Sequence, residues 1–239
     1  MNKPVAIGAI MVGKAVPFGR PGAVSAIDKG PLDGPVELTT LGFIGDEQGD
    51  RRHHGGPDKA VHHYAFDHYD RWRRELHPVP EVLAAAGAFG ENVSTLGMTE
   101  DDVCAGDIYR LGGATLQVSQ ARQPCWKLNH RFGVKDMARR VQASGRTGWY
   151  YRVLEPGLVN RGDALILLDR PFAGWTLSRI LRALYVDMLD METLAGIAAI
   201  EPLAPSWRTL ATRRLETGRV EDWAKRLGEV AEPIDGAAR

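Results

Sequence analysis

Cysteine is scarce in this chain, and long apolar runs and a net charge are absent. Only two of the 239 residues are cysteines, Cys104 and Cys125, too few for the disulfide framework of a small secreted protein. No apolar run approaches the length of a membrane span. The 30 lysines and arginines balance 30 aspartates and glutamates, so the chain lacks the basic excess with which nucleic-acid-binding proteins neutralise phosphates. We therefore expect a cytoplasmic protein that binds neither nucleic acid nor a membrane.

The rest of the composition is that of a globular protein, with 44% hydrophobic and 25% charged residues. A chain of 239 residues is long enough for one large β domain, or for one full hydrophobic core with an appendage. The first residues, MNKPVAIGAIMVGKAV, partly resemble a signal peptide, but Gly8, Gly13 and Lys14 interrupt the apolar run. We interpret this segment as a first strand.

Short alternating stretches punctuated by Gly, Pro and Asp continue to about residue 170, which is typical of strands. The clearest hairpin is predicted over 107–119, where Gly112 and Gly113 can both take the positive φ of a tight turn. A further pair of strands is predicted over 148–154 and 163–169. Many short strands with frequent turns favour a closed or sandwiched β domain over residues 1–170.

Helical periodicity interrupts the strands once and then replaces them. One amphipathic helix is predicted over 65–77 from the spacing of its aromatic and leucine residues. From Trp175 onward we expect three helices, within 174–186, 190–200 and 204–218. Thr176 would cap the first, Ser206 would cap the third and Gly218 would end it. Residues 171–239 are thus predicted to form a small three-helix C-terminal domain with a tail.

Histidine and carboxylate side chains crowd the stretch GDEQGDRRHHGGPDKAVHHY, residues 45–64. Such side chains are ligands for zinc and other divalent metals, although the spacing does not reproduce a zinc-binding helix. In a strand, His62 and His63 point to opposite faces and cannot share one site. A turn or surface position is the more ordinary interpretation of His53, His63 and His68.

The Gly55-Gly56 turn in the same stretch allows a different use. Its exposed backbone N–H groups, with Lys59 and His62 nearby, could bind an anionic group such as a phosphate. The stretch FGENVS adds Glu91 and Asn92, which either line a pocket as a polar pair or lie on a solvated edge strand.

Cys125 has four cationic residues within a few positions, namely Arg122, Lys127, His130 and Arg131. Nearby cations lower the pKa of a thiol and favour the nucleophilic, metal-binding thiolate. A buried core position is the commonest fate of a free cysteine, and the cations argue against it here. Cys104 has acidic neighbours in DDVCAGD, so we expect it to be a core residue.

Four stretches, taken together and in order, resemble the YiiM-type MOSC proteins, whose domain is named after the C-terminal part of molybdenum cofactor sulfurases. They are GDEQGDRRHHGGPDKAVHHY, GAFGENVSTLGMTEDDVCAGD, RQPCWKLNHRFG and GRTGWYYRVLEPG. The likeness covers nearly the whole chain. It implies a mainly β fold with some α, a MOSC-type largely closed β barrel followed by a small three-helix appendage. It also implies binding of the molybdenum cofactor, a molybdopterin that carries Mo.

The resemblance further implies a reductase of N-hydroxylated compounds, notably hydroxylaminopurine-type base analogues, that serves detoxification. Cys125 would be the thiolate ligand to molybdenum or a sulfur acceptor. His54 or His62 is the candidate proton donor. The residues expected to contact the cofactor are Gly55, Gly56, Lys59, His62, Glu91, Asn92, Arg122, Lys127 and Asn129.

The chain has no flavin, nicotinamide or iron–sulfur motif, so electrons would come from a separate donor protein. The C-terminal helices are a candidate docking surface for that donor or for a second copy in a homodimer, although packing against the barrel is the commoner role. Two alternatives stay open: a sulfur-carrying transferase with a Cys125 persulfide, and a non-catalytic carrier of the cofactor. A histidine-rich metal hydrolase ranks below both.

Overall fold

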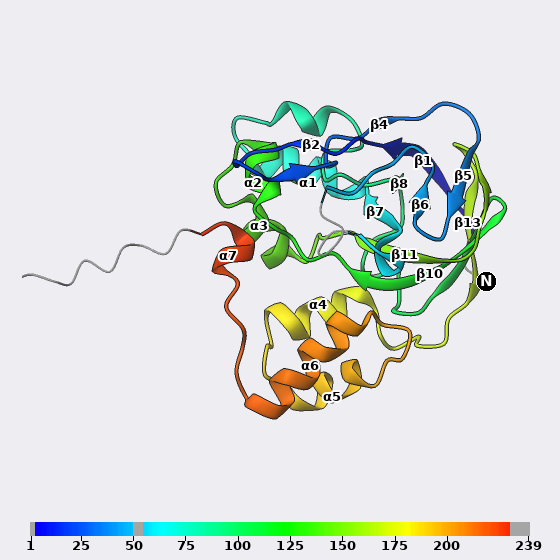
Figure 1. Ribbon diagram of the computed structural model, residues 1–239. Coiled ribbons are helices and arrows are strands. Elements are labelled where there is room, and N and C mark those ends of the chain that lie inside the picture. The colour runs from blue at the N-terminus through cyan, green and yellow to red at the C-terminus, as the bar shows by residue number, and fades with distance from the viewer. Residues whose placement is uncertain (1–2, 50–54, 230–239) are drawn as a thin grey trace, which may run out of the picture.

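A closed β barrel forms the centre of the computed structural model, which describes residues 3–49 and 55–229 (Figure 1). Within these residues the barrel has seven strands: β1 (Val5–Val12), β7 (Val61–Ala65), β8 (Val93–Thr95), β9 (Ile108–Leu111), β10 (Ala114–Ala121), β11 (Trp149–Glu155) and β13 (Ala164–Asp169). The order around the ring is β13-β9-β10-β11-β7-β8-β1, and β1 pairs again with β13. Only β7 and β8 run parallel within this ring. The prediction of a largely closed β barrel is confirmed.

Short strands extend the barrel. β4 (Gly30–Pro31) pairs with the end of β1. A separate sheet has the order β12 (Gly157–Val159), β5 (Val36–Thr39) and β6 (Gly42–Phe43). β2 (Val16–Pro17) and β3 (Val24–Ser25) form a two-stranded ribbon. This ribbon precedes the loop of residues 25–29, which reaches the candidate site.

The predicted hairpin is confirmed as β9 and β10. Of its two turn glycines only Gly112 has a positive φ, at 56°, so the expectation for Gly113 is wrong. A side chain at Gly112 would also collide with the Leu158 carbonyl oxygen 2.6 Å away. The strands predicted over 148–154 and 163–169 exist as β11 and β13, but they pair with different neighbours rather than with each other.

Among the described residues of the β region there are three α-helices, where the sequence predicted one. The predicted helix is α1 (Asp67–Glu75), and the missed ones are α2 (Lys127–Phe132) and α3 (Met137–Ser144). Gly133 and Gly145 end α2 and α3 in the left-handed conformation. Both helices are too short to show a clear period in the sequence. The 3-10 turns η1 (Pro57–Lys59) and η2 (Glu81–Ala84) complete this part.

The C-terminal region contains α4 (Leu177–Tyr185), α5 (Met191–Ala198), α6 (Pro205–Thr217) and the short α7 (Ala224–Leu227). Thr176 caps α4 as predicted, because its side chain accepts a hydrogen bond from Arg179 N. Ser206 does not cap α6, since the helix already begins at Pro205 and Ser206 lies inside it. Gly218 ends α6 in the left-handed conformation, as predicted.

Two hydrophobic clusters hold these parts together. The larger runs from the barrel interior into α4, α5 and α6, with Trp149 and Trp207 among its fully buried members. The smaller lies among α1, α2 and α3 and includes Leu227 of α7. In Figure 1, α7 lies beside α2 and α3, away from α4, α5 and α6. The chain therefore returns to the barrel side after the helical region.

Candidate active site

A small hollow beside Cys125 collects most of the predicted site residues. Its volume is about 80 Å³, and we call it the Cys125 pocket. Its lining includes Lys29, Asp46, Lys59, His62, Asn92, Arg122, Cys125, Lys127 and Tyr150. Residues from the barrel strands and from separate loops thus line one pocket.

Cys125 lies between the end of β10 and the start of α2, and it is 7% exposed. Arg122 and Lys127 line the same pocket, where each donates a hydrogen bond to a backbone carbonyl: Arg122 Nη1 to Phe89 at 2.7 Å, Lys127 Nζ to Val24 at 2.8 Å. These bonds fix both cations beside the thiol without using a carboxylate. The pocket therefore keeps positive charge near Cys125.

The other two predicted cations lie elsewhere. His130 packs edge-on against Phe18 with ring centroids 4.8 Å apart. Arg131 donates to the Ala88 carbonyl and pairs with Asp28. Neither lines the Cys125 pocket. The expectation that all four cations surround the thiol is therefore wrong for His130 and Arg131.

Lys29 and Asp46 form a buried ion pair in the pocket that sequence reasoning missed. Burial lowers the pKa of Lys29, and the neighbouring Asp46 opposes that shift. Asp46 also accepts hydrogen bonds from Gly13 N and Asn92 Nδ2, each at 2.8 Å. The two residues lie 17 positions apart in two loops, so no sequence periodicity predicts that they pair.

His62 lies on β7 with its backbone fixed by Asn92. His62 N donates to Asn92 Oδ1 at 3.0 Å, and Asn92 N donates to the His62 carbonyl at 2.7 Å. Burial, and next Arg122, hold the pKa of His62 well below its usual range. The imidazole is therefore neutral at neutral pH. Its Nε2 is buried and has no hydrogen-bond partner among the described residues.

Tyr150 also lines the pocket and packs against His62, with ring centroids 4.9 Å apart. Burial raises the pKa of the Tyr150 hydroxyl; Arg122 opposes the shift and Cys125 adds to it. Tyr150 is therefore a neutral wall of the pocket that sequence reasoning did not identify.

Glu91 and Asn92 do not act as the predicted pair. Asn92 lines the pocket, but its Nδ2 also donates to the Met11 carbonyl at 3.0 Å, so its amide is used within the protein. Glu91 is fully buried outside the lining, where Oε1 accepts from Gly87 N and Oε2 from Phe89 N, at 2.7 and 3.0 Å. Burial raises the pKa of Glu91. The structure does not bring Glu91 to the pocket, and it is not solvated either.

Of the other residues predicted to contact the cofactor, some line the pocket and some do not. Lys59 lines the pocket, but Gly55 and Gly56, which precede it, do not. Asn129 points away from the pocket and bridges Leu227 O and Ala138 N at 2.8 and 2.7 Å. His54 and His53 lie outside the described residues, so the predicted donor His54 has no structural account.

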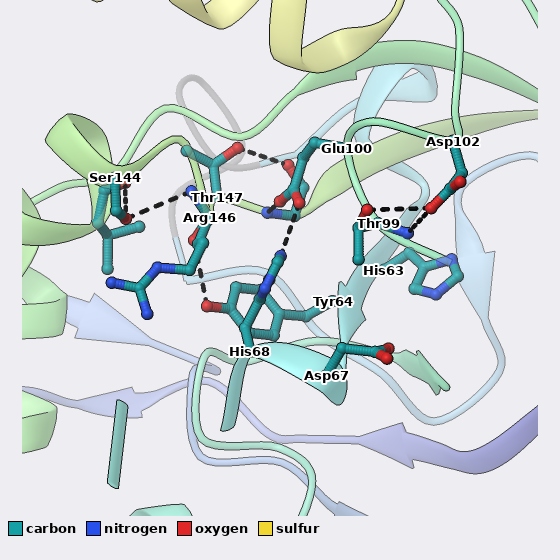
Figure 2. Close-up of polar contacts among 12 residues, drawn as sticks. His63, Tyr64, Asp67, His68, Thr99, Glu100, Asp102, Ser144, Arg146 and Thr147 are labelled. Carbon is teal, nitrogen blue, oxygen red and sulfur yellow. Dashed lines mark hydrogen bonds and ion pairs between the residues drawn. The ribbon is translucent and has the colours of Figure 1, made fainter. Parts of the chain in front are cut away.

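Figure 2 shows a polar network that includes Glu100, His68 and Thr147. Glu100 accepts a hydrogen bond from Gly148 N and contacts His68 Nε2, both at 2.7 Å. The Gly148 carbonyl in turn accepts from Arg122 N at 2.9 Å. A Cβ on Gly148 would lie 3.0 Å from His62 Nε2, so glycine permits this close approach. The network holds Gly148 in place. Gly148 in turn bonds Arg122 and lies next to His62.

His63 and His68 are buried, so the surface interpretation of these two residues is wrong. His63 lies on the opposite face of β7 from His62, where its ring nitrogens contact Tyr151 and Thr95 at 3.0 and 2.8 Å. Burial lowers the pKa of His63 to about 3. The prediction that the adjacent histidines serve different faces is confirmed.

A larger hollow of about 1110 Å³ lies along β1, β8 and β13. Small side chains line much of it, among them Ala6, Ala9 and Ala85, and none of the predicted site residues does. Among the described residues no group of three or more His, Cys, Asp or Glu side chains could hold a metal. Chemistry rather than volume therefore makes the Cys125 pocket the candidate site.

Comparison with known proteins gives matches over both regions of the chain. Family models match residues 50–166 as a MOSC domain and residues 175–218 as a YiiM-like 3-alpha helix domain. Protein YiiM of Escherichia coli is 41% identical over 215 residues, which are 90% of this chain and 93% of that protein. The chain belongs to the YiiM-type MOSC family. The resemblance stated from the sequence is thereby confirmed.

Further relatives of this MOSC protein extend the comparison. A protein of Gibberella moniliformis named Reductase is 40% identical over 194 residues, which are 81% of this chain but 34% of that protein. The crystal structure of YiiM from Escherichia coli superposes with a TM-score of 0.80 at 33% identity and covers 95% of this chain and 99% of that one. No helix in the described ranges of this YiiM-type chain is long and apolar enough to cross a membrane.

Proposed function

We propose that this YiiM-type protein is a molybdenum-cofactor-dependent reductase of N-hydroxylated compounds, hydroxylaminopurine-type base analogues among them, and that it serves detoxification in the cytoplasm. Three findings support the proposal: the MOSC family, a relative named as a reductase, and the Cys125 pocket. The observation that carries it is the placement of a thiol among fixed cations. A soft sulfur ligand suits a molybdenum centre.

The residues of the pocket fit the anionic end of such a cofactor. Cys125 supplies a sulfur donor, and Lys59, Arg122 and Lys127 supply positive charge. The buried Nε2 of His62 has no described partner and offers a further polar contact. A hollow of about 80 Å³ holds only a small group, so most of the pterin would lie outside it. The side chains of the pocket therefore suit the cofactor chemically, although the pocket does not enclose the whole cofactor.

Reduction of an N–OH group to an amine consumes two electrons and two protons and releases water. The bound cofactor would pass the electrons, which a separate donor protein supplies. Cys125 would hold the metal, and the neighbouring cations would stabilise negative charge on the cofactor. Substrate orientation falls to the walls of the site, including Tyr150.

Lys29 is a better proton source than His62. His62 is neutral at neutral pH because burial and Arg122 lower its pKa. Lys29 Nζ carries a proton in its ion pair with Asp46, and burial lowers its pKa. Asp46, in contact with that ammonium group, would hold it in place during transfer. We therefore assign proton delivery to Lys29 and a polar contact to His62.

The test is metal and pterin analysis of protein produced in a host that makes the cofactor, paired with reduction of hydroxylaminopurine by an artificial reductant. Wild type is compared with Cys125→Ala, and Cys104→Ala is the matched control because it removes the other buried thiol. We expect molybdenum and activity in wild type and Cys104→Ala, with both lost in Cys125→Ala. Activity without molybdenum, or a Cys125→Ala protein that behaves as wild type, contradicts the proposal.

Two outcomes would support the alternatives instead. A stable persulfide on Cys125, seen as one added sulfur by mass spectrometry and passed to an acceptor, would indicate a sulfurtransferase. Bound pterin with no turnover of any N-hydroxylated substrate would indicate a carrier.

A further inference from the structure

The two neighbours of Cys125 in the chain are both hydrogen-bonded to one residue near the C-terminal end of the described chain. Arg226 Nη1 donates to the Pro124 carbonyl, and Trp126 N donates to the Arg226 carbonyl at 2.8 Å. The same guanidinium donates through Nη2 to Gln142 Oε1 of α3 at 2.6 Å. The loop that carries the thiol is thus held on both sides of the sulfur by α7.

The anchoring of α7 does not depend on these contacts. Leu227 is buried in the smaller hydrophobic cluster, and its carbonyl accepts from Asn129 Nδ2 at 2.8 Å. The segment before α7 is tied to the helical region, because Glu221 accepts from Arg214 and from Trp223 Nε1. Removal of the Arg226 side chain should therefore leave α7 in place.

Arg226 contributes nothing to the lining of the Cys125 pocket, so its effect on the thiol must pass through the backbone. The loop joins the end of β10 to the start of α2, and Cys125 O already accepts from Leu128 N at 3.0 Å. A guanidinium donor on the carbonyl that precedes Cys125 restricts the remaining freedom of that loop. The thiol is 7% exposed while these bonds hold.

We propose that Arg226 is a positioning residue that holds the Cys125 loop and keeps the thiol in the pocket. It lies beyond residue 218, outside both regions matched by the family models. The inference deepens the proposed function, on which its catalytic meaning rests. Its structural content is testable on the protein without any cofactor.

The experiment is the rate of alkylation of Cys125 by iodoacetamide, followed by peptide mass mapping, across a range of pH. In Arg226→Ala we expect a rate about tenfold above wild type, because a hydrogen bond from a charged donor is worth roughly that factor in an opening equilibrium. Lys225→Ala is the matched control, since Lys225 is an exposed cation next to Arg226 on α7. It should react as wild type does, and Arg226→Lys should restore most of the protection.

If Arg226→Ala does not fold, Arg226→Lys is compared with Arg226→Met, two side chains of similar length with and without a donor. Equal alkylation rates in that pair, or in Arg226→Ala and wild type, overturn the proposal whatever the activity assay shows. In cofactor-loaded protein, Arg226→Ala should lower kcat with little change in KM, and Arg226→Lys should recover it. Absence of molybdenum from wild type would instead contradict the proposed function and leave the alkylation result standing.

Discussion

The two cysteines are both free and both buried, yet their surroundings differ. Cys125 faces a pocket lined by Lys29, Lys59, Arg122 and Lys127. Cys104 lies at the junction of the barrel and the helical region, where its N–H donates to Asp107 at 2.9 Å. Burial, and next Asp107, raise the pKa of the Cys104 thiol. Both thiols are buried, but lysines and arginines line the pocket at Cys125, whereas burial and Asp107 disfavour the thiolate of Cys104.

Strand β7 separates the two regions. His62 lines the Cys125 pocket, and His63 on the opposite face contacts Tyr151. The Tyr151 ring packs against Tyr109, whose hydroxyl donates to Asp107 beside Cys104. Alternation along one strand thus assigns adjacent histidines to different chemistry.

The largest expected effect comes from the charge pair of the Cys125 pocket. Asp46→Asn keeps the shape but leaves Lys29 buried without its carboxylate. Loss of one partner of a buried pair typically costs about 3–5 kcal/mol, so the free energy of unfolding should fall by about that much. Lys14→Met, which breaks the exposed Lys14–Glu47 pair, should cost less than about 1 kcal/mol.

Urea unfolding at neutral pH measures both variants. A cost for Asp46→Asn no larger than that of Lys14→Met would mean that the pocket is well hydrated. Water would then screen the charges around Cys125, and the electrostatic contrast with Cys104 would be lost.

The second effect concerns the histidine on the other face of β7. His63 has a pKa of about 3 when folded and 6.5 ordinarily, so below pH 6.5 the unfolded chain binds a proton that the native protein does not. Its stabilising contribution is complete above pH 6.5 and declines as the pH falls toward 3. At pH 5 the loss is about 2 kcal/mol.

His63→Gln should remove this part of the pH dependence while lowering stability at all pH values through its lost contacts. Urea unfolding at pH 7 and pH 5 measures the difference, and replacement of the exposed His130 by glutamine controls for the loss of an imidazole. A variant with the same loss between the two pH values as wild type would show that His63 is protonated in the native state.

Local signals in the sequence predicted much of the fold. Alternation, turn glycines and the cap at Thr176 depend on neighbours in the chain, and they were confirmed as β10, Gly112 and α4. The site was less predictable because its contacts are distant in sequence. Lys127, His130 and Arg131 are spaced as neighbours on one face of α2, but only Lys127, in the first position of the helix, lines the pocket, because the other two lie one turn further along.

No pattern in the sequence indicates which residues of different loops will pair. Lys29 meets Asp46 only because the loop before β4 and the loop after β6 are brought together by the barrel. Glu91 was expected to contact the cofactor together with Asn92, but the turn at 87–90 buries its carboxylate against backbone N–H groups. Such outcomes depend on packing that no local pattern encodes.

A smaller effect tests the junction near Cys104. Thr176→Ala removes the cap of α4 and should lower the free energy of unfolding by about 1 kcal/mol. Ser206→Ala is the matched control, because the sequence suggested a cap there but Ser206 lies within α6. Its effect should stay within about 0.5 kcal/mol. Equal effects in urea unfolding would show that the cap contributes nothing beyond the general cost of losing a hydroxyl.

The finest test addresses the charge beside Cys104 directly. Asp107→Asn removes the carboxylate that raises the pKa of that thiol, so the thiolate should form at lower pH. The shift should be modest, because burial is the larger cause and remains. It is measured as thiolate absorbance during pH titration in a Cys125→Ala background, with the exposed Asp102→Asn as control. A titration midpoint that stays unchanged would make burial the whole cause.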